Sequence, residues 1–529
     1  MTNETSSSHQ EATSNTGEEI QSVAVIDIGT SSIRMAVAEI NSYGDVHILD
    51  SFSQAVSLGK DTFSKGIIRK ETIEECVDIL KSYRRILSEY QISNTQNIRV
   101  VATSAVREAS NRLAFVDRIF SATGFDVEPL DEAETNRITY LGVSRQLTDE
   151  PSLATKNTVI TEIGGGSTEL LAVQNGNVTF AHSYRLGSLR LRTMFDASQT
   201  PAETARHIME NQVTRVVEQI SHHLMQKENV ELIALGGDVR FALSQICPAS
   251  PAHGLRRLDL KDLKEFAERI LKLSIDEIVL KYQITFPDAE TLAPALLAYV
   301  KLAERLHVKQ VLVSNVNLRD GLLEEMATKG VWTDEFREQI VRSAIDLGHK
   351  FDFDITHAKH VANLSQILFR ELQEEHQLEE RYELILYIAA LLHEIGMFIS
   401  VGGYHKHSMY LIQNSELFGL SKQALKFVSL IARYHRRASP KPSHTGYASL
   451  NREGRVAVSK LSAILRVAVA LDESHSQRVK EVSCRREKNR LVVLLKNLDD
   501  ISLEQLALNR TSSLFEEIFG LQVLLRQVS

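Results

Sequence analysis

The spacing of apolar residues along the chain predicts its strands and helices. After a polar start, residues 1–21, the apolar run Val23–Ile28 is followed by a turn and by the alternating segment Ile33–Ile40. Such runs joined by tight turns predict β-strands. Between residues 72 and 90 the apolar side chains instead recur with the spacing of a helix. Strands that alternate with helices are typical of an α/β domain, which we place at residues 22–148.

The same order of elements returns in residues 149–330. When Asp27 is set on Glu162, Gly29 falls on Gly164 and the flanking strand-like segments also coincide. Two such units in register, about 135 residues apart, indicate an internal duplication. A repeated unit of strand, glycine-containing turn, strand, turn and strand is the layout of the actin-like, ribonuclease-H-like fold. The predicted fold is therefore α/β with duplicated actin-like domains.

From about residue 331 the predicted strands give way to helices. Five segments there have helical periodicity, with short turns between them: 336–347, 357–372, 381–392, 422–434 and 460–471. We therefore predict an all-α domain over residues 331–529. A strand-like run at Leu491–Leu495 and the segment Leu514–Leu525 predict a small appendage near its end.

The composition is that of an ordinary globular protein with several domains. The 529 residues are 43% hydrophobic and 24% charged, and we find no apolar run long enough to span a membrane. Residues 1–21 lack the apolar core of a signal peptide and are predicted to be a disordered tail. Cys76, Cys247 and Cys484 match no disulfide or zinc spacing, so we expect a cytoplasmic protein. The net charge of −8 argues against a general nucleic-acid binder.

The two turns rich in glycine, serine and threonine are candidate phosphate-binding loops. Their small residues let backbone N–H groups approach phosphate oxygens, and their hydroxyl groups add donors. In the first loop, residues 27–32, the carboxylate of Asp27 could hold a cation or orient water. The second loop, residues 162–169, contains three consecutive glycines, which weaken a sheet unless another group must approach the backbone closely. Its flanking acids, Glu162 and Glu169, could ligate Mg²⁺ through oxygen.

Four charged residues elsewhere in the α/β part are further candidates. Arg107 lies near a predicted helix start, where guanidinium and amide groups can meet phosphate, although pairing with a nearby acid is an equal alternative. Glu132 and Glu134 follow a strand end, the place where ligands bind in open α/β sheets. Either could act as a general base on water, and the alternative is a first-turn acid that favours the helix dipole. The glycine turn that ends at Asp238 is another close-approach site.

Together these motifs resemble the exopolyphosphatase/guanosine pentaphosphate phosphohydrolase (Ppx/GppA) family over most of the chain. The matching motifs of the α/β part are Ile26–Arg34, Ala102–Arg107, Ile163–Glu169, Tyr184–Gly187 and Leu318–Gly321. Those of the helical part are His357-Ala358, Leu391–Gly396, Gly403–Ser408 and Arg433–Arg437. The loops are shared with actin-like ATPases and sugar kinases, whereas the helical motifs separate this chain from those relatives.

The resemblance implies a Mg²⁺-dependent, homodimeric hydrolase that removes the terminal phosphate of polyphosphate or the γ-phosphate of guanosine pentaphosphate. The residues expected to bind phosphate are Asp27, Gly29, Thr30, Ser31, Ser32, Arg34, Arg107, Gly164, Gly165, Gly166 and Ser167. Glu162 and Glu169 would hold the metal and take part in catalysis. A glutamate after the strand that ends at Leu130, here Glu134, would activate the attacking water.

Three departures from the family pattern leave a second function open. Glu162 stands where the family usually has aspartate, and Asp238 stands where threonine is usual. The family's catalytic glutamate falls on Thr135, and a step of one residue from Glu134 turns a helical side chain by about 100°. The alternative is therefore a weakly active or inactive regulatory protein that binds polyphosphate or guanosine pentaphosphate.

Histidines and acids in the helical part resemble the spaced ligands of HD-type metal phosphohydrolases, so we expect an HD-like domain. These residues are His357, His393, Glu394, His435 and Asp472. We favour structural or phosphate-contacting roles for them, because the same His-Glu form is common in the polyphosphatase family, where this domain is not the catalytic one.

Residues 417–452 contain lysines and arginines but no acid. In an acidic protein this bias favours contact with a polyanion over an ordinary solvated face. With the basic residues that precede this segment, it predicts a channel for a long polyanion. The candidate channel residues are His405, Lys406, His407, Arg433, His435, Arg436 and Arg437.

Overall fold

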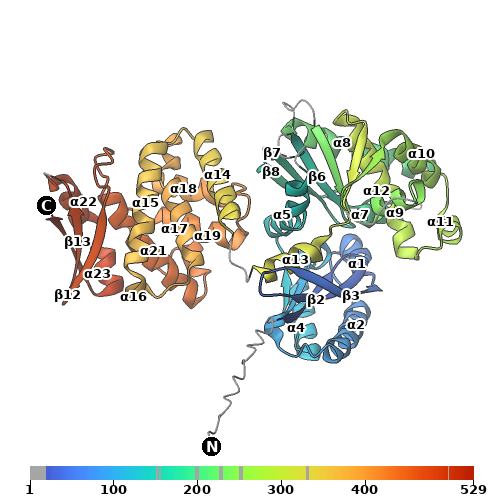
Figure 1. The fold of residues 1–529 in the computed structure, drawn as a ribbon, viewed down its shortest axis with the longest axis horizontal. Coiled ribbons are helices and arrows are strands. Elements are labelled where there is room, and N and C mark those ends of the chain that lie inside the picture. The colour runs from blue at the N-terminus through green and yellow to red at the C-terminus, as the bar shows by residue number, and fades with distance from the viewer. Residues whose placement is uncertain are drawn as a thin grey trace, which may run out of the picture.

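The computed structural model shows two α/β domains, one above the other, with a helical region beside them (Figure 1). It describes residues 20–150, 153, 156–196, 202–224, 230–248, 254–328, 333–498 and 500–528. The predicted tail, residues 1–21, lies outside the described residues except for its last two. Within the described ranges, no helix combines the length and the apolar character that crossing a membrane requires.

The first α/β domain is built on a five-stranded sheet of order β3-β2-β1-β4-β5. Its strands are β1 (Gln21–Ile28), β2 (Ser32–Ile40), β3 (Val46–Ala55), β4 (Ile98–Ala102) and β5 (Val127–Pro129). Its helices are α1 (Leu58–Lys65), α2 (Lys70–Glu89), α3 (Ser104–Glu108), α4 (Arg112–Thr123) and α5 (Glu132–Asp149). Strand β1 pairs antiparallel with β2 and parallel with β4, so its carboxyl end lies in the middle of the sheet.

The second α/β domain repeats this pairing in a six-stranded sheet of order β10-β11-β9-β6-β7-β8. Its strands are β6 (Asn157–Ile163), β7 (Thr168–Gln174), β8 (Asn177–Tyr184), β9 (Val230–Leu235), β10 (Arg256–Asp259) and β11 (Gln310–Val313). Strand β6 pairs antiparallel with β7 and parallel with β9, as β1 does with β2 and β4. The predicted duplication is therefore confirmed in the connectivity of both sheets.

Helices of the second domain pack against its sheet, and the last one crosses to the first domain. They are α7 (Ser188–Asp196), α8 (Ala202–Leu224), α9 (Gly237–Ile246), α10 (Leu260–Leu271), α11 (Ile275–Tyr282), α12 (Phe286–Arg305) and α13 (Leu318–Ala327). Leu322 and Leu323 of α13 are buried in one apolar cluster with Val25 of β1 and Ile138 of α5. A Cβ on Gly321 would overlap the Ile138 carbonyl, so glycine there permits the close contact of α13 with α5.

The helical region ends in a small sheet. Its helices are α14 (Asp334–Lys350), α15 (Ile355–Glu371), α16 (Gln373–His376), α17 (Arg381–Leu392), α18 (Tyr404–Gln413), α19 (Lys422–Arg433), α20 (Thr445–Ala448) and α21 (Arg452–Ala470). The sheet contains β12 (Val482–Glu487), β13 (Arg490–Lys496) and β14 (Gln522–Val528), with α22 (Ser502–Thr511) and α23 (Ser513–Phe519) between the last two strands. The predicted appendage is therefore a three-stranded sheet with two helices.

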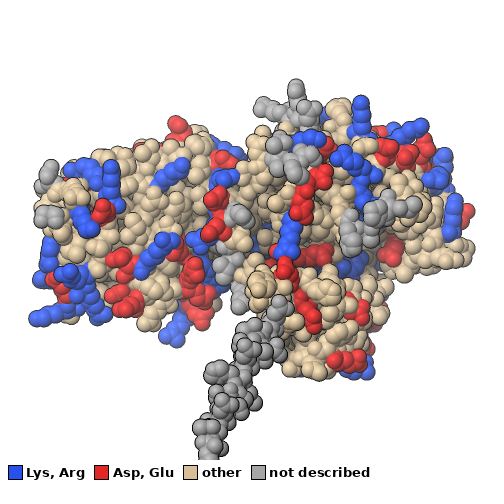
Figure 2. Space-filling model, viewed as in Figure 1, with Lys and Arg blue, Asp and Glu red and all other residues tan. Residues whose placement is uncertain are grey.

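Specific contacts fix the helical region against the α/β part. The Gln339 side chain of α14 accepts from Val178 N (3.0 Å) and donates to the Gly176 carbonyl (2.8 Å) at the turn before β8. Close by, Lys422 N donates to the Asp131 carboxylate (2.7 Å), which caps α5. Figure 2 shows acidic and basic side chains next to one another along this junction. The helical region thus holds the N-terminus of α5 in place.

Candidate functional site

A cavity of about 370 Å³ lies between the two α/β domains, where β1 and β6 end. The carboxyl ends of parallel strands are the usual ligand site of such sheets. Every residue that the sequence predicted to bind phosphate lines this cavity, together with both metal candidates. The set is Asp27, Gly29, Thr30, Ser31, Ser32, Arg34, Arg107, Glu162, Gly164, Gly165, Gly166, Ser167 and Glu169.

The two loops have the same backbone hydrogen bond. Gly29 N donates to the Ser32 carbonyl (3.0 Å), and Gly164 N donates to the Ser167 carbonyl (2.9 Å). Each loop closes an antiparallel pair of strands. The two loops that the sequence aligned, with Asp27 on Glu162, are therefore turns of the same backbone structure.

The glycines of the second loop are required by the approach of the first domain. A Cβ on Gly165 would overlap Thr30 Oγ1, and a Cβ on Gly166 would overlap Ser104 Oγ. Any side chain at either position would push the two domains apart. The triglycine sequence therefore lets the second loop meet the first, with hydroxyl groups of the first domain directly against its backbone.

In the first loop, Asp27 is a buried carboxylate that lacks full hydrogen bonding. Burial raises its pKa, and the nearby Arg319 and Arg34 guanidinium groups oppose that rise. Arg319 Nη1 lies 3.7 Å from Asp27 Oδ2, whereas Oδ1 is buried and has no hydrogen-bond partner among the described residues. A buried carboxylate oxygen without a partner at the wall of a cavity is suited to hold a cation or a water molecule.

In the second loop, Glu162 and Glu169 are opposite each other on β6 and β7. Burial, reinforced by the negative charge of Glu162, raises the pKa of Glu169 to about 7, although Ser167 Oγ donates to Glu169 Oε1 (2.6 Å). Burial also raises the pKa of Glu162. Across the cavity, burial raises the pKa of Asp238 to about 6, against a hydrogen bond from Thr291 Oγ1 (3.1 Å). Several acids at one site thus carry an unfavourable charge when ionised.

The cleft suits a hard divalent cation such as Mg²⁺. Its donors are carboxylate oxygens, and one of them, Asp27 Oδ1, is buried without a partner among the described residues. Mg²⁺ characteristically takes one or two carboxylates and completes its shell with water and phosphate oxygens. Among the described residues, the group of three side chains with ligand atoms within 4.8 Å of one another lies in the helical region instead. In the cleft, water or substrate oxygens would therefore supply the remaining ligands.

The predicted base Glu134 does not line the cavity, whereas Thr135 does. Burial raises the pKa of Glu134, which interacts with the charges of Glu128 and Arg137. Neighbouring residues on a helix point about 100° apart, so the side chains of Glu134 and Thr135 on α5 face different ways. Thr135 Oγ1 donates to the Asp131 carbonyl (2.8 Å), so the group at this position is a hydroxyl held by its own helix. The assignment of Glu134 as base is corrected accordingly, because its carboxylate lies outside the cavity.

The other candidate base, Glu132, also lies elsewhere. Its Oε2 is 3.7 Å from Lys422 Nζ, and it lines a second cavity at the junction with the helical region. Glu132 therefore contributes to the contact between the first α/β domain and the helical region. Arg107 does line the cleft, where its Nη1 donates to the Leu130 carbonyl (2.9 Å).

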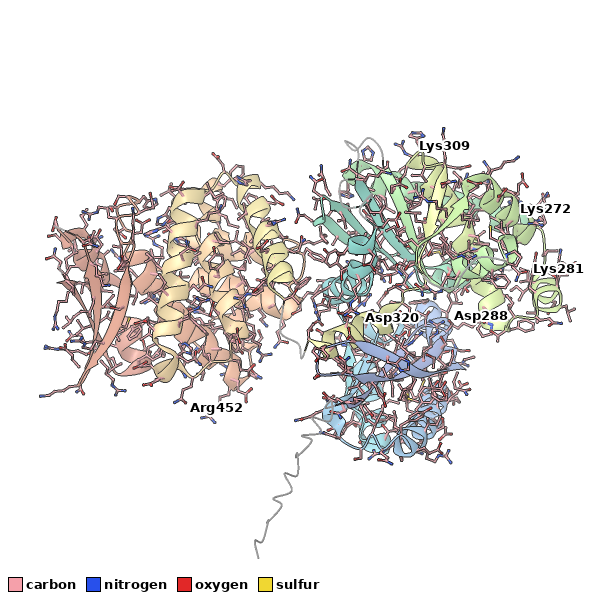
Figure 3. The ribbon with its side chains drawn as sticks, viewed as in Figure 1. Lys272, Lys281, Asp288, Lys309, Asp320 and Arg452 are labelled. Carbon is pink, nitrogen blue, oxygen red and sulfur yellow. The ribbon has the colours of Figure 1, made fainter. Side chains whose placement is uncertain are left out.

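Sequence reasoning gave no role to Arg319 and Arg240, and named neither Asp288 nor Thr291. Asp288 and Thr291, at the start of α12, line the cleft, and Figure 3 shows Asp288 where the two α/β domains face each other. Arg319 lies within the capping box of α13, between Asn317 and Asp320, and Asp320 accepts from Asn317 N (2.7 Å). The motif Leu318–Gly321 marks this segment in the sequence. That Arg319 lies near Asp27 is seen only in the folded structure, where α13 packs on the first domain.

The structure gathers five of the predicted channel residues at one place and excludes another. Burial lowers the pKa of His405, and so do the nearby Arg436, Lys406, Arg433 and His407, which lie on α18, at the end of α19 and just after it. Lys406, Arg436 and Arg437 are exposed.

His435 does not belong to this surface. Only 1% of it is exposed, and its Nδ1 donates to the Ala432 carbonyl (2.5 Å) while its Nε2 contacts the Tyr404 hydroxyl (3.2 Å). The acid-free segment 417–452 does not distinguish a buried histidine from an exposed one. The channel assignment of His435 is thus corrected to a buried position.

Two actin-like domains that close a phosphate-loop cavity, with a helical region beside them, define a class of phosphate-handling proteins. The chain matches the model of the Ppx/GppA phosphatase family over residues 36–330 and that of Ppx/GppA phosphatase domain III over residues 340–517. It therefore belongs to the Ppx/GppA phosphatase family, as its motifs predicted.

One relative and two solved structures are similar to this chain. The chain is 25% identical over 457 residues to a guanosine-5'-triphosphate,3'-diphosphate pyrophosphatase of Photobacterium profundum, in a match that covers 85% of this chain and 86% of the relative. An exopolyphosphatase structure from Cytophaga hutchinsonii is 24% identical, with a TM-score of 0.53 over 58% of this chain and 98% of its own. An exopolyphosphatase-like protein gives a TM-score of 0.51 at 20% identity, over 59% of this chain and 99% of its own. The two structures support the fold.

Proposed function

We propose that this protein is a Mg²⁺-dependent phosphoanhydride hydrolase that releases terminal phosphate from polyphosphate or from guanosine pentaphosphate. The observation that carries the proposal is the convergence of both phosphate loops, Arg34, Arg107 and the acid pair Glu162–Glu169 on one cavity. The names of the relatives, a pyrophosphatase and an exopolyphosphatase, are in keeping with this chemistry. The cytoplasmic location and the homodimer stay predictions.

In this proposal the chain's own residues divide the work between the two domains. Loop amides, the hydroxyls of Thr30 and Ser31, and Arg34 and Arg107 bind and orient the terminal phosphate. Glu162 and Asp27 hold Mg²⁺, which when bound offsets charge on the phosphoryl group. Such positioning and charge stabilisation supply most of the catalysis of phosphoryl transfer.

The proton of the attacking water needs an acceptor inside the cavity. Thr135, which lines the cavity, has no basic group, and Glu134 lies outside. Glu169 does line the cavity, and its pKa of about 7 is suited to accept a proton near neutral pH. We therefore assign the role of base to Glu169.

The hydroxyl at position 135 favours a second candidate function, that of a binding protein with little or no turnover. In that case the cleft would bind polyphosphate or guanosine pentaphosphate, and the helical region would report its occupancy through the contact of Lys422 with the Asp131 cap of α5. This function requires binding without multiple turnover.

Phosphate release from long-chain polyphosphate and from guanosine pentaphosphate, each with and without Mg²⁺, tests the two functions. We expect Mg²⁺-dependent multiple turnover by the wild type. With Glu169 as the base, we expect Thr135→Glu to change the rate little, whereas a rise of about 100-fold or more would mean that the wild type lacks a base in the cavity. Tight binding without phosphate release by the wild type would establish the binding protein instead.

The rate of phosphate release by Glu134→Gln tests whether Glu134 or Glu169 is the base. Glu134→Gln is expected to leave phosphate release within about twofold of the wild type, because its side chain is outside the cavity. A loss of about 100-fold or more in this variant would restore Glu134 as the base and overturn the assignment of Glu169.

A further inference from the structure

The second cavity, at the junction of the helical region with both α/β domains, has a volume of about 410 Å³. Its walls come from α5, from β8 and from the segment that leads from the end of α18 into α19. Figure 1 shows α5 and β8 on the side of the α/β part that faces the helical region. The volume is in the range of sites for small molecules. The proposed hydrolysis makes no use of this cavity.

Part of the wall of this cavity is apolar. Leu417, Phe418 and Leu425 of the helical region line it and are buried, and Ala133 and Ala181 line it from α5 and β8. Sites for small molecules are typically mostly apolar, with a few polar groups that fix the orientation of the ligand. An apolar wall that includes an aromatic side chain suits a planar ring.

Asn136 of α5 is the buried polar side chain of this cavity. It is 3% exposed, and its Oδ1 is buried without a hydrogen-bond partner among the described residues. Its Nδ2 makes one long contact, of 3.5 Å, with Ser183 Oγ, which also lines the cavity. A buried amide oxygen without a partner is costly and uncommon in folded proteins. A ligand that donates to Oδ1 and accepts from Nδ2 would remove this cost.

The charged side chains of the cavity leave one lysine without an acidic partner. Lys422 Nζ lies 3.7 Å from Glu132 Oε2, and His182 Nδ1 lies 2.8 Å from Glu416 Oε1. Lys426 also lines the cavity; its Nζ donates to a serine hydroxyl (2.6 Å) and forms no ion pair within the described ranges. Lys426 is therefore available to an anionic group of a ligand.

We propose that this cavity binds an adenine nucleotide with one phosphate group, the base at Asn136 and the phosphate at Lys426. One edge of adenine presents the donor N6–H beside the acceptor N7, and an asparagine amide pairs with both. Guanine presents two acceptors, N7 and O6, on that edge. Its N2 amino group would need a further acceptor, whereas both carboxylates of the cavity, Glu132 and Glu416, are already in ion pairs.

Helix α5 forms part of the wall of both cavities. Asn136 and Ala133 line the cavity at the junction, whereas Thr135 lines the cleft of the phosphate loops. A nucleotide at Asn136 would thus contact the helix that borders the cleft without occupying the phosphate loops. Its binding is therefore independent of the hydrolysis proposed above.

Isothermal titration calorimetry of the full-length chain with adenosine monophosphate tests this site, because it needs no phosphate release. We expect one equivalent to bind, at least about tenfold more tightly than guanosine monophosphate, since the two-point contact of asparagine with adenine discriminates by about that factor or more. Arg34→Ala, which changes the cleft, should bind adenosine monophosphate as tightly as the wild type. A loss of binding in Arg34→Ala would place the nucleotide in the cleft and overturn the proposal.

Asn136→Ala removes both groups that would contact the base. We expect adenosine monophosphate to bind about tenfold more weakly or worse, and the preference over guanosine monophosphate to disappear. Without ligand the Tm of this variant should not fall, because alanine favours a helix and the buried oxygen without a partner is removed. Unchanged affinity in a folded Asn136→Ala variant would contradict the assignment of the base site.

Lys426→Met is expected to weaken binding by about tenfold or more while the preference for adenine is kept, because it removes only the phosphate contact. The matched control is Lys441→Met, which removes an exposed lysine of the same acid-free segment outside the cavity. It should keep the full affinity. Equal losses in the two lysine variants, or an absence of adenosine monophosphate binding in the wild type, would overturn the proposal.

Discussion

In the first loop the residue opposite Asp27 across the strand pair is Arg34, whereas in the second loop the residue opposite Glu162 is another acid, Glu169. The backbone turns share the same hydrogen bond, so the difference lies in side chains alone. One loop carries hydroxyls and a cation, which suit an anion. The other combines a bare glycine backbone with two acids, which suit a cation.

This difference teaches that a duplicated turn can keep its shape while its two copies acquire complementary chemistry. In the proposed function the cleft binds a phosphate chain and Mg²⁺, which carry opposite charges, so it needs cationic and anionic groups together. The charge of the second loop is unfavourable without a cation, as the raised pKa of Glu169 indicates. The loss of Glu169 should therefore affect the chemistry, and the loss of Arg34 should affect substrate affinity.

Glu169→Gln is expected to have the largest effect. It removes the proposed base and one of the two opposed acids, so phosphate release should fall by about 100- to 1,000-fold. The measurement is kcat for phosphate release at saturating Mg²⁺ and polyphosphate. The matched control is Glu128→Gln, an exposed acid near Glu134 that does not line the cavity. Equal losses in the two variants would mean that the second loop has no special role.

Arg34→Ala is expected to act mainly on substrate affinity. A hydrogen bond to a charged group contributes about 1.5 to 3 kcal/mol, so KM for polyphosphate should rise about tenfold or more. Because Arg34 binds the substrate before and during the reaction, kcat should change less than KM. Steady-state kinetics that separate kcat from KM make the comparison. A large fall in kcat with unchanged KM would contradict the division of roles between the loops.

The duplication and both loops could be predicted from the sequence because their signals are local. A glycine turn between two apolar runs specifies a hairpin wherever it lies, and the two copies confirm each other. The strands β1 and β6 and the loops that follow them are where they were predicted.

Features that depend on distant contacts could not be predicted. Helix α13 follows the second sheet in sequence yet packs on the first, which brings Arg319 to Asp27. Whether Glu134 or Thr135 faces the cavity depends on the residue at which α5 begins, and the Asp131 cap sets that residue. His435 was assigned to a basic surface because composition carries no information about burial.

The dependence on pH of the stabilisation by Mg²⁺ is the smallest expected effect and follows from the acids of the second loop. The folded pKa of Glu169, about 7, lies above its ordinary value of 4.5, so the folded protein binds this proton more tightly than the unfolded chain. The contribution of Glu169 to the free energy of unfolding is therefore complete below pH 4.5 and is lost as pH rises to 7. The loss is on the order of 3 kcal/mol.

Mg²⁺ should restore this stability, because a cation held by Glu162 and Asp27 offsets the charge of the ionised Glu169 opposite Glu162. We expect the increase in Tm on addition of Mg²⁺ to be larger by a few degrees at about pH 8 than at about pH 5, measured by differential scanning calorimetry. In Glu169→Gln the dependence of this increase on pH should be weaker. In Arg34→Ala it should persist, since that variant keeps both acids of the second loop. An equal increase at both pH values would place Mg²⁺ away from Glu162 and Glu169, and the cation-binding character assigned to the second loop would then fail.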